Sequence, residues 1–389
     1  MNESDPFPLP APTGGRVDIL LIAGEHSGDE HAARMVRELR GKHPEAVIAA
    51  LGGPELAAAG AQLLFDLTAS SVVGIVEVLK NYPFFKRLFG EILRWVEEHR
   101  PRAVCFVDYP GMNLRLAAAL RERGLSTKGG GKIKTVFYIS PQIWAWKAGR
   151  RFTMARDLDA MAVIFPFEVE CYADTDLPVQ FVRHPFVEAD YRAPVKYDPS
   201  APVLLLPGSR KQAVSRIFPD LIKGFQLFGE RAGIVLYPSD DILGVLQAAH
   251  PPTSVRLIPI DESHATVDPV AASAVLTSSG TMSMHCALAG IPGAIVYRAN
   301  PITYVMGRML VKIDYLGIAN LLLNEPMYPE FIQKDATAQA LAGQLRLAVH
   351  DANRRQRTFE QAARLRAMLS QPGTQSAADW LSHQVGWKL

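Results

Sequence analysis

Short apolar runs that end in Gly, Pro or Ser alternate along this chain with longer segments of helical periodicity. Uninterrupted apolar runs are typical of strands buried on both faces of a parallel sheet. Two parallel strands also need a helix-length crossover between them, which the intervening segments supply. The runs expected to form a first sheet cover residues 17–23, 47–51, 103–107, 135–139, 160–165 and 179–182. This pattern predicts a doubly wound α/β domain.

A second series of the same kind follows a loop-like segment near residues 191–201. Its expected strands cover residues 203–206, 233–237, 255–259, 272–277 and 294–297. A chain of 389 residues is also too long for one ordinary core. We therefore expect an α/β fold of two Rossmann-like domains that face each other across a ligand-binding cleft. The expected segments are a flexible lead-in at 1–16, the domains at 17–196 and 197–355, and helices at 356–389 that close the structure or cross back.

Composition limits the classes of partner and compartment. The net charge of +2 offers no overall basic surface, so no nucleic-acid partner is expected. Cys105, Cys171 and Cys286 lack metal-ligand spacing, which favours reduced thiols and the cytoplasm. The first residues lack the basic start and apolar run of a secretory signal, and no segment reaches the roughly 18 apolar residues of a spanning helix. Attachment to a membrane surface remains open.

Two turns in the second domain have the character of phosphate-binding loops. Residues 207–211 read Pro-Gly-Ser-Arg-Lys directly after a predicted strand, and residues 278–281 read Ser-Ser-Gly-Thr after another. Such turns expose backbone N–H groups beside a helix N-terminus, and Arg210 can bind phosphate oxygens with two donors. Each turn alone can also be an ordinary connection with an N-cap serine. The two together favour a nucleoside diphosphate, whereas the absence of Walker A and G-x-G-x-x-G motifs argues against an ATPase or a dinucleotide oxidoreductase.

Further segments carry a family resemblance over nearly the whole chain. They include Gly24-Glu25-His26-Ser27-Gly28-Asp29, Gly52-Gly53-Pro54, Ser140-Pro141-Gln142-Ile143-Trp144-Ala145-Trp146, Pro166-Phe167-Glu168 and Leu206-Pro207-Gly208-Ser209-Arg210-Lys211-Gln212. In their order and spacing the sequence resembles the lipid-A-disaccharide synthases, a family of glycosyltransferase family 19 type. The resemblance implies a GT-B fold and an inverting, cofactor-free hexosyltransferase that does not depend on a metal.

The resemblance also implies substrates and a location. The donor is a UDP-linked acylated glucosamine, and the acceptor is an acylated glucosamine phosphate. The enzyme is then expected in the cytoplasm, peripheral at the inner face of the inner membrane, with a homodimer left open. Two alternatives remain: a divergent paralogue with another sugar nucleotide or acceptor, and a catalytically impaired relative that binds lipid or nucleotide.

Inversion needs a general base for the acceptor hydroxyl, and Asp108 is the first candidate. It directly follows the predicted strand 103–107, and it matches the aspartate that the family regards as catalytic. A helix-capping role is the alternative. Glu25 and Asp29, in the first strand-turn-helix connection, are the next candidates and would position the acceptor, although Asp29 also suits a helix N-terminus.

The nucleotide side departs from the family pattern at several positions. The residues that the motifs indicate for nucleotide binding are Gly208, Ser209, Arg210, Ser279, Gly280, Thr281, His285, Asn320 and Gln333. His285 stands where the family has a glutamate that accepts hydrogen bonds from the ribose, and a neutral imidazole offers only one acceptor. Arg183, Ala213 and Ala319 also replace usual residues. Of these changes, His285 is the one that bears on uridine-ribose binding.

A membrane-contact segment is expected at residues 72–93, where apolar side chains accompany Lys80, Lys86 and Arg87. The residues expected to meet lipid or acyl chains are Val73, Val76, Leu79, Phe84, Phe85, Leu88 and Phe89. The alternative is a helix packed on the first sheet.

No metal site is predicted. Residues adjacent on one helix, such as Asp29, Glu30 and His31, do not face one another and so do not converge on an ion. Asp174-Thr175-Asp176 and Asp157-Leu158-Asp159 resemble the metal-binding pair of another glycosyltransferase architecture, but so short a pattern is common by chance. Solvated carboxylates are expected at the first of these.

Overall fold

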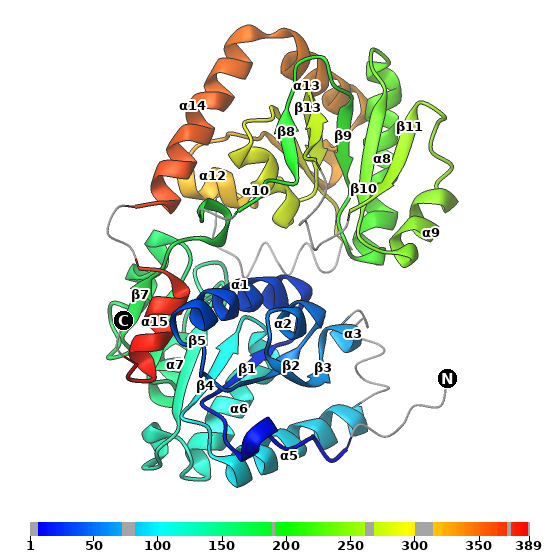
Figure 1. The fold of residues 1–389 in the computed structure, drawn as a ribbon. Coiled ribbons are helices and arrows are strands. Elements are labelled where there is room, and N and C mark those ends of the chain that lie inside the picture. The colour runs from blue at the N-terminus through cyan, green and yellow to red at the C-terminus, as the bar shows by residue number, and fades with distance from the viewer. Residues whose placement is uncertain are drawn as a thin grey trace. The chain divides into compact units, whose positions relative to one another are not determined.

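A computed structural model describes residues 7–71, 82–188, 191–260, 268–299, 314–371 and 375–387. The chain divides into two compact units (Figure 1). Unit 1 consists of Met1–Pro185 and Gln371–Leu389, and unit 2 of Phe186–Ser370.

Unit 1 is built on a seven-stranded sheet whose described pairings are all parallel. The strands are β1 (Ile19–Ala23), β2 (Ile48–Gly52), β3 (Gln62–Asp66), β4 (Ala103–Val107), β5 (Lys134–Tyr138), β6 (Ala160–Val163) and β7 (Val179–Phe181). Their order across the sheet is β3-β2-β1-β4-β5-β6-β7. The chain thus moves outward from β1 in one direction and then from β4 in the other, which is the doubly wound arrangement.

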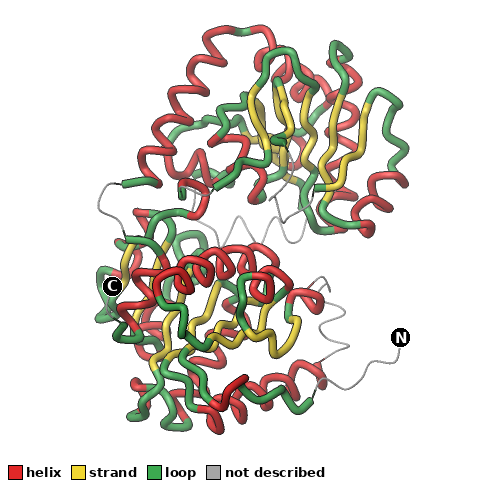
Figure 2. The backbone as a smooth tube through the Cα atoms, viewed as in Figure 1, coloured by secondary structure: helices red, strands yellow, loops and turns green. Residues whose placement is uncertain are grey.

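Helices cover both faces of this sheet (Figure 2). The helices are α1 (His26–Lys42), α2 (Pro54–Ala58), α3 (Thr68–Ser71), α5 (Tyr82–His99), α6 (Pro110–Glu122), α7 (Arg150–Asp157) and α15 (Ala377–Gln384). Short 3-10 turns are η1 (Thr13–Gly15), η2 (Thr127–Gly129), η3 (Pro166–Glu168), η4 (Glu170–Tyr172) and η5 (Pro185–Val187), the last at the junction of the units. Helix α1 packs with α2 and α15, and α6 packs with α5 and α7. Because the sheet is covered on both sides, every residue of β1, β2 and β4 is buried, which explains their uninterrupted apolar sequences.

Unit 2 repeats this plan with a parallel six-stranded sheet in the order β11-β10-β9-β13-β14-β15. Its strands are β9 (Val203–Leu206), β10 (Gly233–Tyr237), β11 (Val255–Pro259), β13 (Ala274–Thr277), β14 (Gly293–Tyr297) and β15 (Glu330–Ile332), beside a two-stranded sheet of β8 (Val195–Tyr197) and β12 (Val270–Ala272). Its helices are α8 (Lys211–Phe228), α9 (Asp240–Ala248), α10 (Thr281–Leu288), α12 (Ile318–Leu323), α13 (Ala338–His350) and α14 (Ala352–Leu369), with the 3-10 turn η6 (Gln333–Asp335). The predicted fold class of two doubly wound units is therefore confirmed.

The C-terminal segment returns to the first unit, as the sequence predicted for part of it. Helix α15 lies beside α1 although the two are at opposite ends of the chain, red and blue in Figure 1. The Ser376 hydroxyl donates to the Glu38 carboxylate over 2.7 Å, and Lys42 pairs with Asp379. Helix α14, by contrast, belongs to unit 2, so only the last part of residues 356–389 crosses back.

The junction between the units also differs from the expected boundary at residues 196 and 197. Unit 2 begins at Phe186 because that ring packs on His285 of α10, with 4.1 Å between ring centroids. Tyr191 stacks on the same Phe186. The segment that looked like a linker in sequence therefore carries aromatic core contacts.

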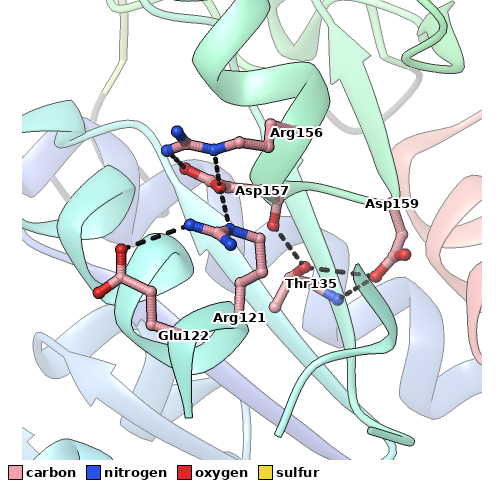
Figure 3. A network of polar contacts seen from close by, with 6 residues as sticks. All are labelled: Arg121, Glu122, Thr135, Arg156, Asp157 and Asp159. Atoms are coloured by element: carbon pink, nitrogen blue, oxygen red, sulfur yellow. Dashed lines mark hydrogen bonds and ion pairs between the residues drawn. The ribbon is translucent and has the colours of Figure 1, made fainter. Parts of the chain in front are cut away.

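A polar network ties α6 and α7 to β5 in unit 1 (Figure 3). The buried Asp157 carboxylate accepts hydrogen bonds from Arg121 at 2.6 Å and from Arg156 at 2.8 and 2.9 Å. Asp159 accepts from the backbone N–H of Thr135 at 2.7 Å. Asp157 and Asp159 therefore serve the fold. Asp174, for which a solvated carboxylate was expected, is instead paired with Arg151.

The predicted membrane segment is described only from residue 82 onward. Val73, Val76 and Leu79 lie outside the described residues. Leu88 is fully buried in the core of unit 1, and Phe84 and Phe89 pack against that core. The expectation that Leu88 meets lipid is therefore wrong, and the described part of α5 follows the alternative of a core helix. Among the helices in the described ranges, none has the length and apolar character needed to cross a bilayer.

Candidate functional site

The central strands of unit 1 end at a topological switch point. Strands β1 and β4 are neighbours, and Ala23 pairs with Val107 at their carboxyl ends. After β1 the chain builds one side of the sheet, and after β4 it builds the other. In open α/β sheets, ligands bind outside the carboxyl ends of the strands at such a point. Glu25 follows β1 and Asp108 follows β4, so both lie at the edge of the sheet where a ligand is expected.

Asp108 has an unusual backbone conformation. Asp108 and Tyr109 have φ angles of 46° and 49°, which are left-handed values that non-glycine residues rarely adopt. Such strain persists only where the surroundings enforce it, and it is concentrated at functional sites. The Asp108 N–H donates to the carbonyl of Tyr138, which fixes this turn to the end of β5. The half-buried Asp108 side chain is thereby presented at the edge of the sheet.

The first turn of α1 and the ring of Tyr109 pack closely around Asp108. A Cβ atom on Gly24 would lie 2.3 Å from the Tyr109 ring, so only glycine leaves room for that ring. A Cβ on Gly28 would lie 3.9 Å from the Asp108 Cβ. Burial raises the pKa of Tyr109, and the charge of Glu25 raises it further. Glu25 therefore lies near Tyr109, the residue that directly follows Asp108.

Asp29 has a structural role instead. It is 1 % exposed, and its carboxylate accepts hydrogen bonds from the backbone N–H groups of Gly53, Glu55 and Leu56 at 2.8, 3.0 and 3.3 Å. These are the first N–H groups of α2, which a carboxylate caps well. Burial raises the pKa of Asp29 against the opposing effect of those hydrogen bonds. The predicted role of Asp29 in positioning the acceptor is corrected to the alternative, a helix N-terminal anion.

Sequence reasoning missed a second carboxylate near Asp108. Glu168 follows β6 and is 2 % exposed. It accepts hydrogen bonds from the Trp144 indole at 3.3 Å and from the Phe165 N–H at 3.2 Å. Burial raises its pKa to about 8 despite those bonds, and the negative charge of Asp108 raises it further. Glu168 stands in the Pro166-Phe167-Glu168 segment of the family resemblance, but no role was predicted for it because its burial depends on the tertiary fold.

Asn113 is another missed residue. It lies in the first turns of α6 and is fully buried. Its amide nitrogen lies 3.2 Å from the Ile22 carbonyl, 3.4 Å from that of Val107 and 2.8 Å from that of Asp108. One side chain thus joins β1, β4 and the strained turn.

Unit 2 has its own switch point, between β9 and β13. Leu206 pairs with Thr277 at the carboxyl ends of these neighbouring strands. The two predicted phosphate-type turns follow them and lie side by side, since a Cβ on Gly208 would lie 3.2 Å from the Ser278 hydroxyl. Gly208 has a φ of 113°, which favours glycine. The structure therefore brings Gly208, Ser209 and Arg210 next to Ser279, Gly280 and Thr281.

Both turns open into helix N-termini. Helix α8 begins after Arg210 and α10 after Gly280, and neither N-cap residue caps its helix through a side-chain hydrogen bond. Arg210 is exposed, and so are Gly280 and Thr281. The N–H groups and the positive ends at two helix N-termini suit the binding of an anion, and the Arg210 guanidinium lies at one of them.

His285 lies in the second turn of α10 and is 5 % exposed. Its Nδ1 shares a hydrogen bond with the Tyr191 hydroxyl, and its ring packs on Phe186. This aromatic cluster occupies the place that the resemblance gives to the ribose-binding glutamate.

Asn320 and Gln333 are used within unit 2. The buried Asn320 amide donates to the Tyr328 carbonyl at 2.6 Å and to Glu330 at 2.9 Å, and it accepts from the Tyr328 N–H at 2.8 Å. The Gln333 amide pairs in both directions with the backbone of Ala299 at 3.1 Å. The predicted nucleotide-binding role of Asn320 is thus corrected to bracing of α12 against β15, since all its polar atoms are occupied. No group of three or more His, Cys, Asp or Glu side chains able to hold a metal ion occurs within the described ranges.

The sequence matches one protein family along most of its length. The model of the lipid-A-disaccharide synthetase family matches residues 19–385. The lipid-A-disaccharide synthase of Geobacter sulfurreducens is 35% identical over 346 residues, which cover 84% of this chain and 86% of that protein. Lipid-A-disaccharide synthase 1 of Legionella pneumophila subsp. pneumophila is 35% identical over 365 residues, which cover 90% and 93%.

Solved structures resemble the fold at much lower identity. The glycotransferase of kitacinnamycin has a TM-score of 0.58 at 15% identity, and the match covers 95% of this chain and 99% of that one. UGT71G1 of Medicago truncatula, solved in complex with UDP-glucose, has a TM-score of 0.57 at 11% identity, with coverage of 95% and 99%. At these identities the likeness shows the fold alone, which is the GT-B arrangement of two Rossmann-like units.

Proposed function

Because this chain belongs to the lipid-A-disaccharide synthetase family, we propose that it transfers 2,3-diacylglucosamine from its UDP derivative to 2,3-diacylglucosamine 1-phosphate, as an inverting glycosyltransferase. The products are a β-1,6-linked disaccharide phosphate and UDP. The family relationship favours this activity over that of a paralogue acting on another sugar nucleotide or of an impaired relative.

Unit 2 is proposed to hold the nucleotide sugar. Its support is the pair of adjacent turns at the β9 and β13 ends, each of which leads into a helix N-terminus, with Arg210 at the start of α8. Departure of UDP places negative charge on the diphosphate, and preorganised N–H groups and a guanidinium stabilise that charge as it develops. Ser209, Ser279 and Thr281 add hydroxyl groups at the same edge.

Unit 1 is proposed to hold the acceptor and its base. Asp108 accepts the proton of the attacking 6-hydroxyl while that oxygen bonds to the anomeric carbon of the donor. A positioned general base contributes about 10²- to 10⁴-fold to such a step. The observation that carries this proposal is the strained turn of Asp108 and Tyr109 at the β1 and β4 switch point. Glu25 lies near Tyr109 and is proposed to orient the acceptor sugar.

The location proposed for the enzyme is peripheral, on the cytoplasmic face of the inner membrane, because both substrates carry acyl chains. A homodimer is proposed as the oligomeric state, and light scattering tests it.

Purified protein with the UDP-linked donor and the monosaccharide phosphate acceptor tests this function directly. We expect disaccharide formation by the wild type and a rate lowered at least about 100-fold in Asp108→Asn. The affinity for UDP should be nearly unchanged in that variant, and Asp176→Asn, at a carboxylate remote in sequence from either switch point, is the matched control. Near-normal turnover by Asp108→Asn removes Asp108 as the base, and absence of product with wild type rejects the function.

A further inference from the structure

Two exposed aromatic side chains occur at the start of α7. Trp146 precedes that helix and is 43 % exposed, and Phe152 lies in its first turn and is 53 % exposed. Exposed Leu227 and Leu347, by comparison, are on α8 and α13 of unit 2. Large aromatic side chains so far out of the core indicate a contact surface. We refer to Trp146, Lys147, Arg150 and Phe152 as the α7 surface.

Cations surround these two rings. The Lys147 ammonium lies 4.5 Å from the centroid of the Trp146 ring, and the Arg150 guanidinium carbon lies 5.1 Å from it. Neither Lys147 nor Arg150 forms an ion pair with a carboxylate of the described residues. Both positive charges are therefore available to an external anionic partner.

The neighbouring cations are different, since they are neutralised internally. Arg151 lies over Phe152, with 4.3 Å to the ring centroid, and is paired with Asp174. Arg156 is paired with Asp157 (Figure 3). Arg151 and Arg156 are thus neutralised by carboxylates, whereas Lys147 and Arg150 have no carboxylate partner among the residues that the structure describes.

A surface pocket of about 500 Å³ adjoins Phe152. The pocket is lined by Lys128, Phe152, Ala155, Arg156, Asp174, Thr175 and Asp176. The apolar ring therefore stands at the rim of a polar hollow. An aromatic ring beside polar groups of this kind suits the boundary between acyl chains and headgroups.

We propose that the α7 surface is a docking site through which unit 1 binds an anionic phospholipid bilayer. Trp146 and Phe152 insert at headgroup depth, while Lys147 and Arg150 meet the negative surface potential of the leaflet. The inference rests on the proposed function to the extent that acylated substrates place the enzyme at a bilayer. It assigns the contact to α7, whereas the described part of α5 is packed into the core.

The charges of the surface argue for lipid over other occupants. Lys147 and Arg150 have the same sign and flank an exposed ring, so a second copy of this surface would bring like charges together. A bilayer containing phosphatidylglycerol satisfies both the rings and the cations. An acidic protein partner would satisfy the cations without requiring insertion of Trp146 and Phe152.

Sedimentation of the full chain with vesicles provides the test. Vesicles of phosphatidylcholine with phosphatidylglycerol are compared with vesicles of phosphatidylcholine alone. We expect the wild type to bind the anionic vesicles and the double variant Trp146→Ser with Phe152→Ser to bind at least about tenfold more weakly. The double variant Lys147→Gln with Arg150→Gln should lose the preference for anionic vesicles. Leu227→Ser with Leu347→Ser, which removes two exposed apolar side chains from unit 2, is the matched control and should bind as wild type does.

Three results would overturn the proposal. The first is that the aromatic double variant binds anionic vesicles as strongly as the wild type does. The second is that the leucine control loses as much vesicle binding as the aromatic variant. The third is that the aromatic variant changes from dimer to monomer without any loss of vesicle binding. Thermal unfolding of each variant shows whether the fold is retained.

Transfer measured with detergent-dispersed substrates separates this inference from the proposed function. Variants of the α7 surface should keep their activity in micelles and lose it on vesicle-embedded acceptor. A wild type that is inactive in micelles but binds anionic vesicles through α7 rejects the function and leaves the docking surface standing.

Discussion

The side-chain amide of Asn113 donates to the main-chain carbonyl of Asp108, with 2.8 Å between nitrogen and oxygen. The same nitrogen lies near the carbonyls of Ile22 and Val107, the first within β1 and the second at the end of β4. A buried amide in this position links the two strands of the switch point to the residue proposed as the base. It thereby accounts for the left-handed backbone that Asp108 retains.

Asn113→Ala should loosen that turn and slow transfer. Loss of a buried hydrogen-bond donor should lower the free energy of unfolding by about 1 to 3 kcal/mol. We expect kcat to fall by about 10- to 100-fold, because misplacement of a catalytic group by about 1 Å has effects of that size. UDP affinity, a property assigned to unit 2, should be unchanged. Thr135→Val also removes a buried hydrogen-bond donor, but at the opposite end of the sheet, and it should lower stability without a comparable loss of kcat.

Arg210→Ala should weaken UDP binding. A charge-assisted hydrogen bond to the diphosphate is worth about 1.5 to 3 kcal/mol, which titration calorimetry measures as a loss of affinity of about tenfold or more. Lys223→Ala removes another exposed cation further along α8 and serves as the control for net charge. Equal affinity in Arg210→Ala and wild type would count against a phosphate site at this helix N-terminus.

His285→Glu tests whether the glutamate that the family has at this position accepts hydrogen bonds from the ribose. A carboxylate offers two acceptor oxygens to the ribose hydroxyls, and we expect UDP to bind about 1 kcal/mol more tightly. The same change places a charge against Phe186 in a buried site, so the thermal midpoint should fall. His285→Gln, which supplies one neutral acceptor oxygen, is the control. UDP affinity that stays constant or decreases in His285→Glu would refute the ribose interpretation.

The strands that sequence patterns predicted best are the central ones. Strands β1, β4 and β9 are buried on both faces, so they appear as continuous apolar runs. Strands β3 and β15 were missed. They are edge strands with mostly half-buried residues, and such strands lack the apolar run that identifies their neighbours.

The candidate site shows the same division between local and tertiary information. The turns after β4, β9 and β13 could be predicted because the carboxyl ends of parallel strands share one edge. The internal role of Asn320 could not, because it binds backbone groups that the sequence does not place nearby. For Asp29 the sequence offered a helix N-terminus as the alternative, but it did not identify α2 as that helix. No role was predicted for Glu168 for a related reason, since its environment is formed by Trp144 and Phe165 in the folded chain.

Asp157→Asn should lower the free energy of unfolding and should make that free energy depend less on pH in the acidic range. Burial alone would raise the pKa of Asp157, but hydrogen bonds from Arg156 and Arg121 outweigh it and lower that pKa below its ordinary value of 3.8. A lowered pKa in the folded state stabilises the fold above pH 3.8, and this contribution is lost as pH falls through the folded-state value. At neutral pH the free energy of unfolding of the variant should therefore be about 1 to 3 kcal/mol lower than that of the wild type, which a denaturant titration measures. This difference in free energy should shrink at acidic pH. Asp174→Asn, at a more exposed pair, should have the smaller effect.

Glu168→Gln should change the response of the enzyme to alkaline pH. Burial raises the pKa of Glu168 from 4.5 to about 8, so between these values the folded protein holds a proton that the unfolded chain has lost. The free energy of unfolding of the wild type should then decrease as pH rises through this range. A glutamine at this position does not titrate, so the decrease should be smaller in the variant. Glu170→Gln removes an exposed carboxylate two residues away and should behave as wild type.

The same titration should be visible in catalysis through Asp108. The charged or titratable groups that face Glu168 electrostatically include Asp108 as well as Cys171 and Tyr172, and ionisation of Glu168 places a second negative charge beside the proposed base. We expect the pH profile of kcat to bend near pH 8 in the wild type and to lack that inflection in Glu168→Gln. A wild-type profile that is flat around pH 8, or an inflection that persists in the variant, would show that Glu168 does not influence the base and that its role is confined to holding Trp144.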